Sequence, residues 1–271
     1  MSSRTGTDVG TLLGIWAHPD DEAYLSAALM AQARRAGNRV VVVTATRGEH
    51  GTDDPHTWPP GRLARHREQE LLRSLEVVGV EEHRWLGYAD GSLTAADATL
   101  AVAAVERLIT EVAPDMIVTF GPDGMTGHPD HRTVSSWVGA AWRRSGTAAE
   151  LWHATLTPDF HAAWGALNER VGLWFEGATP PVTEPSELAA QVVCSGDLLG
   201  LKLRELPAHA SQTRSLEELV GEATYRAWWS TESFVAAARE PAVSRASAPD
   251  APGRPGASYD GRREHRRAAS G

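Results

Sequence analysis

Residues 12–22 read LLGIWAHPDDE, so a short apolar run passes directly into a cluster of imidazole and carboxylate side chains. A second apolar run, MIVTF at residues 116–120, is followed by a similar cluster, GHPDH at residues 127–131. A buried strand that ends in a titratable turn is where open α/β folds place their chemistry. Because two such strand ends can meet at one edge of a sheet, we expect the two clusters to form a single site.

Around these blocks, apolar runs alternate with segments of helical spacing. The expected strands are residues 12–16, 40–44, 82–86, 116–120, 150–156 and 191–194. The expected helices are residues 22–36, 62–78, 95–112, 132–144, 160–173, 197–211 and 222–239. Repeated strand-then-helix units predict an α/β fold with a mostly parallel sheet and helices on both faces. We expect a single domain over residues 11–240, a flexible N-terminus (1–10) and a disordered tail (241–271).

The overall composition excludes several classes of function. A formal net charge of -9 argues against non-specific nucleic-acid binding, which needs a basic surface. No apolar stretch approaches the roughly 18 residues of a membrane span, and residues 1–10 lack the apolar run of a signal peptide. The single cysteine, Cys194, cannot form an internal disulfide, which is compatible with a reducing compartment. We therefore expect a cytoplasmic protein, of a subunit number that the sequence leaves open.

The spacing inside the two blocks favours a metal site. His18 and Asp21 are three residues apart at the start of an expected helix, where side chains at this spacing can face one way. If His131 from the second block completes the set, two histidines and one carboxylate hold the ion and leave open positions, as in catalytic sites. Zn²⁺ is the expected ion, although such a set also accepts Fe²⁺ or Co²⁺. A single histidine in a loop is usually not a ligand, so the prediction depends on the doubling of the block.

The remaining groups of the blocks suit amide hydrolysis. Asp20 can take a proton from a metal-activated water. His128 can stabilise the oxyanion and then protonate the leaving amine, and Asp130 can orient His128. Two other classes remain open: a non-haem iron oxygenase, although those usually have β-barrel folds, and a sugar-binding module with a vestigial site.

The combination of motifs resembles the PIG-L (LmbE-like) family of zinc-dependent N-deacetylases. The resemblance runs in the family's order through residues 17–22, 46–51, 67–70, 86–91, 127–131 and 202–212. It implies a Rossmann-like sheet and zinc ligation by His18, Asp21 and His131. It also implies Asp20 as the general base and His128, partnered by Asp130, as the group that stabilises the tetrahedral intermediate.

The expected reaction is the removal of an acetyl or other acyl group from the amine of an amino sugar or amino-sugar conjugate. The alternatives are an amidase acting on a thiol-cofactor conjugate or on a natural-product N-acyl sugar, and a non-hydrolytic sugar-binding homologue. The expected small-molecule contacts are Arg47, Glu49, Arg67, Asp90, His209 and Gln212, with Arg65 as an alternative to Arg67. Residues 157–187 match no part of the family pattern, so the substrate is left open.

Overall fold

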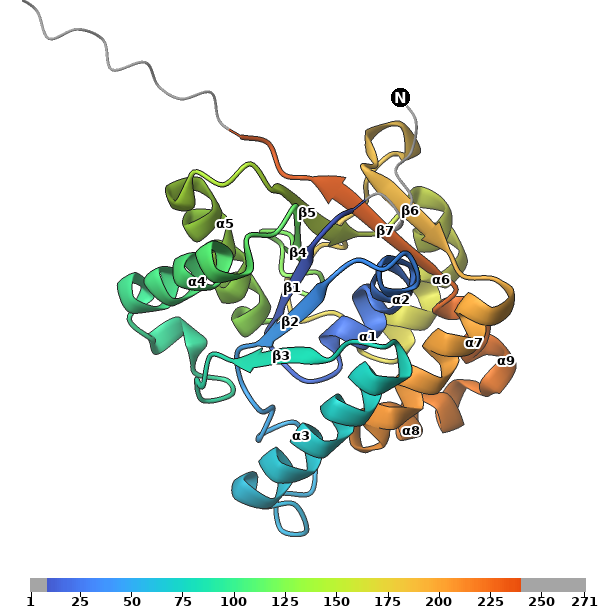
Figure 1. The fold of residues 1–271 in the computed structure, drawn as a ribbon. Helices are drawn as coiled ribbons and strands as arrows, with labels where there is room; N and C mark the ends of the chain where they lie inside the picture. Colours follow the sequence, from blue (N-terminus) through green and yellow to red (C-terminus); the bar gives the residue numbers. More distant parts are fainter. Residues whose placement is uncertain (1–8, 240–271) are drawn as a thin grey trace, which may run out of the picture. The chain divides into compact units, whose positions relative to one another are not determined.

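The apolar runs of the sequence form the middle of one seven-stranded sheet. The computed structural model describes residues 9–239, and its strands lie in the order β3-β2-β1-β4-β5-β7-β6 (Figure 1). The strands are β1 (Leu12–Trp16), β2 (Val40–Thr44), β3 (Glu82–Trp85), β4 (Met116–Phe120), β5 (Glu150–Thr155), β6 (Ala190–Val193) and β7 (Thr231–Ala236). The first five strands run parallel to one another, whereas β7 runs antiparallel to β5 and β6. The predicted α/β class with a mostly parallel sheet is confirmed.

Helices cover both faces of this sheet. They are α1 (Asp21–Leu25), α2 (Ala27–Arg35), α3 (Pro60–Val77), α4 (Ala98–Val112), α5 (Pro129–Ser145), α6 (Pro158–Arg170), α7 (Gly196–Glu205), α8 (Ala210–Val220) and α9 (Glu222–Trp228). Figure 1 shows α4 and α5 packed together on one side of the central strands and α2, α3 and α7 on the other. Every residue of β1, β2 and β4 is buried, as expected for parallel strands that are covered on both faces.

The ends of the helices follow local chemistry that the sequence only partly revealed. The helix expected from residue 95 begins at Ala98, because the Asp97 carboxylate caps it by accepting from the backbone N–H groups of Thr99 and Leu100. The helix expected at residues 132–144 begins three residues earlier, at Pro129, whose fixed φ suits a first helical turn. The second histidine block therefore lies in the first turn of α5.

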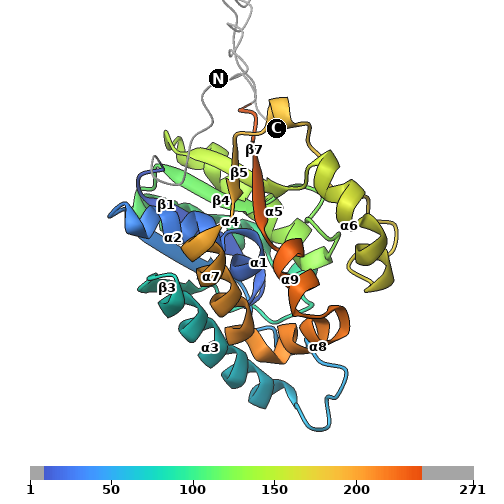
Figure 2. The same ribbon diagram turned by 90° about the vertical axis from the view of Figure 1, so that its right-hand side faces the viewer.

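The C-terminal part differs most from the prediction. The helix expected at residues 222–239 ends at Trp228, and residues 231–236 form β7, the strand that follows α9 in Figure 2. This strand pairs with β5 on one side and with β6 on the other. The alanines and tryptophans of this stretch favour a helix locally, but pairing with two strands decides the outcome. The helix expected at residues 197–211 is divided into α7, a 3-10 turn (Leu206–His209) and α8, with Pro207 in the turn.

Residues 1–8 and 240–271 lie outside the described residues, so the predicted flexible N-terminus and disordered tail stay predictions. The described chain up to Ala238 forms one compact unit. None of the helices in residues 9–239 is long and apolar enough to cross a membrane.

A buried ion pair ties the inserted strand to the helices. Lys202 of α7 and Glu232 of β7 have no exposed side-chain surface, and Lys202 Nζ lies 2.7 Å from Glu232 Oε1. The same carboxylate accepts from the backbone N–H groups of Ala28 and Leu29 at the start of α2, at 2.8 and 3.0 Å. Lys202 also donates to the Tyr24 carbonyl. One carboxylate thus joins α2, α7 and β7.

Glu232→Gln is expected to lower the free energy of unfolding by about 3–5 kcal/mol, because it leaves the Lys202 ammonium buried without a counter-charge. Urea unfolding followed by circular dichroism measures the loss. Glu82→Gln is the matched control, since Glu82 makes an ion pair of the same 2.7 Å length with Arg39, but at an exposed position. A much smaller loss is expected there. Equal losses of stability for the two variants would contradict a stabilising role for the buried Lys202–Glu232 pair.

Candidate metal centre

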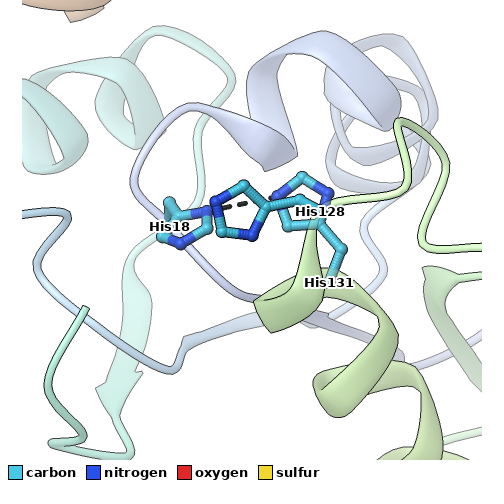
Figure 3. A group of neighbouring side chains, drawn as sticks. All are labelled: His18, His128 and His131. Carbon is cyan, nitrogen blue, oxygen red and sulfur yellow. Dashed lines mark hydrogen bonds between the residues drawn. The ribbon is translucent and has the colours of Figure 1, made fainter. Parts of the chain in front are cut away.

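The two histidine blocks meet at the carboxyl edge of the sheet. His18 follows β1, while His128 and His131 lie at the start of α5, after β4 (Figure 3). Since β1 and β4 are adjacent parallel strands, their ends deliver the blocks to the same place. His18 and His131 are both buried, and His128 is partly exposed. The predicted meeting of the blocks is therefore found in the fold.

Three side chains converge on one point. His18 Nδ1 lies 3.2 Å from His131 Nε2, as the dashed line in Figure 3 marks. Asp21 Oδ1 lies 3.3 Å from His131 Nε2, and Asp21 Oδ2 lies 3.7 Å from His18 Nδ1. The Asp21 carboxylate is held there because Oδ2 also accepts from the backbone N–H groups of Ala17 and His18.

The outer nitrogen of each imidazole is fixed by an acceptor. His18 Nε2 lies 3.1 Å from Asp90 Oδ1 and 3.4 Å from Asp130 Oδ2, so an N–H at this position donates to carboxylates. His131 Nδ1 donates to the Gly124 carbonyl at 3.0 Å. Such partners set the tautomer, so that the inner nitrogens, His18 Nδ1 and His131 Nε2, carry lone pairs.

These donors fit a divalent metal. Two lone pairs 3.2 Å apart repel unless a cation lies between them. Zinc bonds of about 2.0–2.2 Å in a tetrahedron place neighbouring ligand atoms about 3.3–3.6 Å apart. The observed separations of 3.2, 3.3 and 3.7 Å lie close to that range. His18, Asp21 and His131 therefore have the atoms and the spacing of a three-residue metal site.

The pKa values of these three residues are also shifted by burial and by their closeness to one another. Burial alone would lower the pKa of His18, but its hydrogen bonds to Asp130 and Asp90 and the charge of Asp21 raise it to about 10. Burial raises the pKa of Asp21 to about 7, against the opposing charge of His18. Burial and the nearby charge of His18 hold the pKa of His131 well below its ordinary value. A metal ion entering here would displace a proton.

His128 lies beside the centre as a hydrogen-bond donor. Its ring nitrogen Nδ1 accepts from the backbone N–H of Asp130 at 3.0 Å, so the proton of the neutral imidazole is on Nε2. Burial and the charge of His18 lower the pKa of His128, which favours this neutral form. Its ring stacks on His131, with centroids 4.8 Å apart, and meets Phe175 edge-on.

The structure corrects the partner expected for Asp130. Its carboxylate faces His18 and accepts from the backbone N–H groups of Gly91 and Leu93, at 2.8 and 3.3 Å. His128 is held by the backbone N–H of Asp130 and not by its side chain. The reason is the first turn of α5, where His128 is the N-cap and the Asp130 side chain projects toward the loop after β3.

Asp20 is held in a strained backbone conformation next to the metal ligands. Its φ is 120°, a region that a non-glycine residue rarely adopts and that costs about 1–3 kcal/mol. Arg67 Nη2 lies 3.2 Å from Asp20 Oδ2, and the Asp20 backbone N–H donates to Glu22 Oε2 at 3.0 Å. Burial raises the pKa of Asp20, partly offset by Arg67. A carboxylate with a raised pKa suits proton transfer near neutral pH.

Two of the expected small-molecule contacts, Arg67 and His209, support the backbone around Asp20. His209 was expected to line the pocket, but it is completely buried and its Nε2 donates to Glu22 Oε1 at 2.7 Å. Arg67 is also buried and donates to the carbonyls of Pro19 and Gly48. A Cβ at position 48 would collide with the Arg67 guanidinium, so a glycine at this position leaves room for the Arg67 side chain. Both residues thus support the backbone around Asp20, and a contact of either with a substrate stays a prediction.

The other expected contacts are spread around the edge of the centre. Asp90 bridges His18 to the backbone N–H of His50, while Glu49 accepts from the backbone N–H of Asp90. Gln212 donates to the Gly51 carbonyl. Arg47 pairs with Glu68 and lies over the ring of Trp85, so its contact with a substrate stays a prediction.

Glu22, which connects Asp20 to His209, was not predicted as part of the site. The sequence carried a signal for it, because Glu22 is the third acidic residue of the first block. A glutamate in the first turn of a helix is commonly a solvated capping residue. Here it is fully buried. Burial alone would raise its pKa, but the charge and hydrogen bond of His209, together with backbone N–H donors, lower it.

Comparison with known proteins agrees with this geometry. A family model described as GlcNAc-PI de-N-acetylase (PIG-L) matches residues 13–142, which include both histidine blocks. A 1D-myo-inositol 2-acetamido-2-deoxy-alpha-D-glucopyranoside deacetylase of Kineococcus radiotolerans is 32% identical over 246 residues. That match covers 74% of this chain and 68% of the relative. A protein of the same description from Catenulispora acidiphila is 31% identical, covering 77% of this chain and 81% of the relative.

Among solved structures, the N,N'-diacetylchitobiose deacetylase of Pyrococcus horikoshii aligns with a TM-score of 0.56 at 22% identity, covering 85% of this chain and 84% of that one. At such identity the likeness shows a shared fold. The sequence relatives go further, because they cover about three quarters of this chain at more than 30% identity, and the family model includes both histidine blocks. This chain therefore belongs to the GlcNAc-PI de-N-acetylase (PIG-L) family.

Proposed function

We propose that the protein is a metal-dependent hydrolase that removes an acyl group from the amine of an amino-sugar conjugate. The observation that carries the proposal is the convergence of His18 Nδ1 and His131 Nε2 at 3.2 Å, with Asp21 beside both. Zn²⁺ is the proposed ion, with Fe²⁺ and Co²⁺ as alternatives that the same donors accept. When bound, the ion would polarise the amide carbonyl and lower the pKa of a water.

The residues around the centre supply proton transfer and hydrogen bonding. Asp20 accepts a proton as the water oxygen adds to the carbonyl carbon. His128, with its proton on Nε2, donates a hydrogen bond to the carbonyl oxygen as negative charge develops there. When the carbon–nitrogen bond breaks, the proton held by Asp20, or one from His128, passes to the leaving amine. Acid and free amine are the products.

The proposed substrate class is supported by the relatives. The proteins from Kineococcus and Catenulispora are described as deacetylases of an inositol-linked N-acetylated amino sugar, and the Pyrococcus enzyme as a deacetylase of diacetylchitobiose. Glu49, Asp90 and Gln212 remain proposed contacts for sugar hydroxyls at the edge of the centre. The proposed partner is therefore a small molecule, and a cytoplasmic location stays a prediction.

The proposal is tested by amine release from a panel of N-acyl amino sugars. The panel contains free N-acetylglucosamine, its inositol-linked form, N-acetylated oligosaccharides and cysteine-amide conjugates. Metal-stripped protein is assayed with and without added Zn²⁺. Metal-dependent release from an amino-sugar member supports the proposal. Release only from cysteine amides would favour the amidase alternative, and sugar binding without release would favour a non-hydrolytic homologue.

Asp130→Asn is expected to weaken metal affinity about 10- to 100-fold, because the carboxylate fixes the outer nitrogen of His18. Competition with a chromogenic chelator measures the affinity. Asp97→Asn, the same change at the cap of α4, serves as the control and is expected to leave the affinity unchanged. If Asp130→Asn binds metal with normal affinity and loses only turnover, the Asp130 carboxylate does not support metal binding through His18.

A further inference from the structure

An apolar cavity of about 140 Å³ opens directly beside the metal centre. Asp21 and His131, two of the three proposed ligands, line one end of it. The rest of its wall is almost entirely aliphatic and aromatic, including Leu25, Leu156, Phe160, Leu173, Leu216 and Trp229. A second, smaller cavity shares Leu25, Leu156, Phe160 and Trp229 with it and reaches toward β5 and β7. The larger, apolar cavity therefore adjoins the metal centre, whereas polar residues such as Thr155, Thr231 and Glu232 also line the smaller one.

The position of this cavity assigns it to the acyl side of the substrate. The leaving amine must lie near the group that delivers its proton, Asp20 or His128, and His128 does not line the cavity. Asp20 does not line the cavity, and neither do Arg67, Asp90 or Glu49 among the described residues. The polar groups that suit a sugar thus lie around one part of the centre and the apolar wall around another. A substrate whose carbonyl lies between these two regions would extend its acyl chain into the apolar cavity.

The size of the cavity exceeds what an acetyl group needs. A cavity of about 150 Å³ lined by aliphatic and aromatic side chains accommodates benzene. At 140 Å³ the space here is comparable, so a methyl group would leave most of it unfilled. Leu173 lies beyond residues 13–142, the part of the chain that the family model matches.

We propose that this cavity binds the acyl chain, and that the preferred substrate carries an unbranched acyl group of about four to six carbons in place of acetyl. This inference rests on the proposed function. Each methylene that enters the cavity leaves water and adds to the binding of the reacting complex. The apolar wall therefore sets specificity for the acyl group, while the polar residues at the edge of the metal centre bind the sugar.

The test is a chain-length series of N-acylglucosamines from acetyl to decanoyl, assayed with the metal-loaded protein. We expect kcat/KM to rise about fourfold with each methylene up to hexanoyl, and then to stop rising once the cavity is full. Calorimetric binding of hexanoate and acetate to the same protein gives a readout that needs no turnover. Hexanoate is expected to bind at least tenfold more tightly.

A pair of variants on α8 connects the effect to the cavity. Leu216→Trp fills the space and is expected to lower the ratio of hexanoyl to acetyl kcat/KM at least tenfold. Leu219→Trp, on the same helix at a position 65% exposed, is expected to keep the wild-type ratio. Equal ratios for the two variants would overturn the assignment of the cavity.

The outcomes separate this inference from the proposed function. Metal-dependent hydrolysis that is fastest for acetyl, with hexanoate binding no more tightly than acetate, overturns the acyl cavity and leaves the hydrolase intact. No hydrolysis of any acyl group in the presence of metal overturns the proposed function and the acyl assignment together, even if hexanoate binds.

Discussion

His131→Ala is expected to remove the bound metal and to lower kcat by at least about three orders of magnitude. The change deletes Nε2, which lies 3.2 Å from His18 Nδ1 and 3.3 Å from Asp21 Oδ1. The two remaining ligand residues come from one short segment and cannot enclose an ion. Metal content after gel filtration, measured by mass spectrometry, and turnover of the best substrate give the two readouts.

His153→Ala is the matched control for this prediction. His153 is a half-buried histidine on β5, outside the cluster of His18, His128 and His131. We expect it to keep one equivalent of metal. If His131→Ala also keeps one equivalent, His131 is not a ligand. The cluster of His18 with Asp90 and Asp130 would then be the alternative place for the ion.

The meeting of the two blocks was predictable because it depends on rules that hold locally. Each block follows a short apolar run, and parallel neighbouring strands deliver their ends to one edge. The doubling of the His-Pro-Asp string made a shared site a reasonable expectation even without the family resemblance. The same rules gave β1, β2 and β4 with the bounds found in the structure.

The partners of the blocks were not predictable in this way. The Asp130 side chain turns to His18 because the backbone N–H groups of Gly91 and Leu93 are there to receive it. Those groups come from a loop some 40 residues away, and spacing within the block says nothing about them. His209 is a similar case, since its partner Glu22 lies 187 residues away in the chain.

The C-terminal error has a related cause. Residues 231–236 become a strand because β5 and β6 lie on either side of them, and no short pattern in the stretch records those neighbours. The apolar cavity also depends on distant segments, since α1, α6 and α8 all contribute to its wall. The sequence therefore predicts where the chemistry lies better than what surrounds it.

Asp20→Asn is expected to retain the metal and to lower kcat about 10²- to 10⁴-fold, the usual contribution of a positioned general base. Asparagine keeps the shape of the side chain and, like aspartate, tolerates positive φ better than most residues. The fold and the ligand set should therefore survive, and only the ability to accept a proton is lost. Steady-state rates, together with metal content, check both halves of the expectation.

The pH profile gives a sharper form of the same test. Burial raises the pKa of Asp20, so the base form is lost, and kcat falls, at a higher pH than for an exposed aspartate. In Asp20→Asn this acidic limb should disappear from the residual activity. Glu68→Gln is the control, since Glu68 pairs with Arg47 away from the histidines and should keep the wild-type profile. If Asp20→Asn works at a near wild-type rate with its acidic limb intact, Asp20 is not the base. Asp20 and Arg67 would then serve only to hold the strained turn that carries Asp21 into the metal centre.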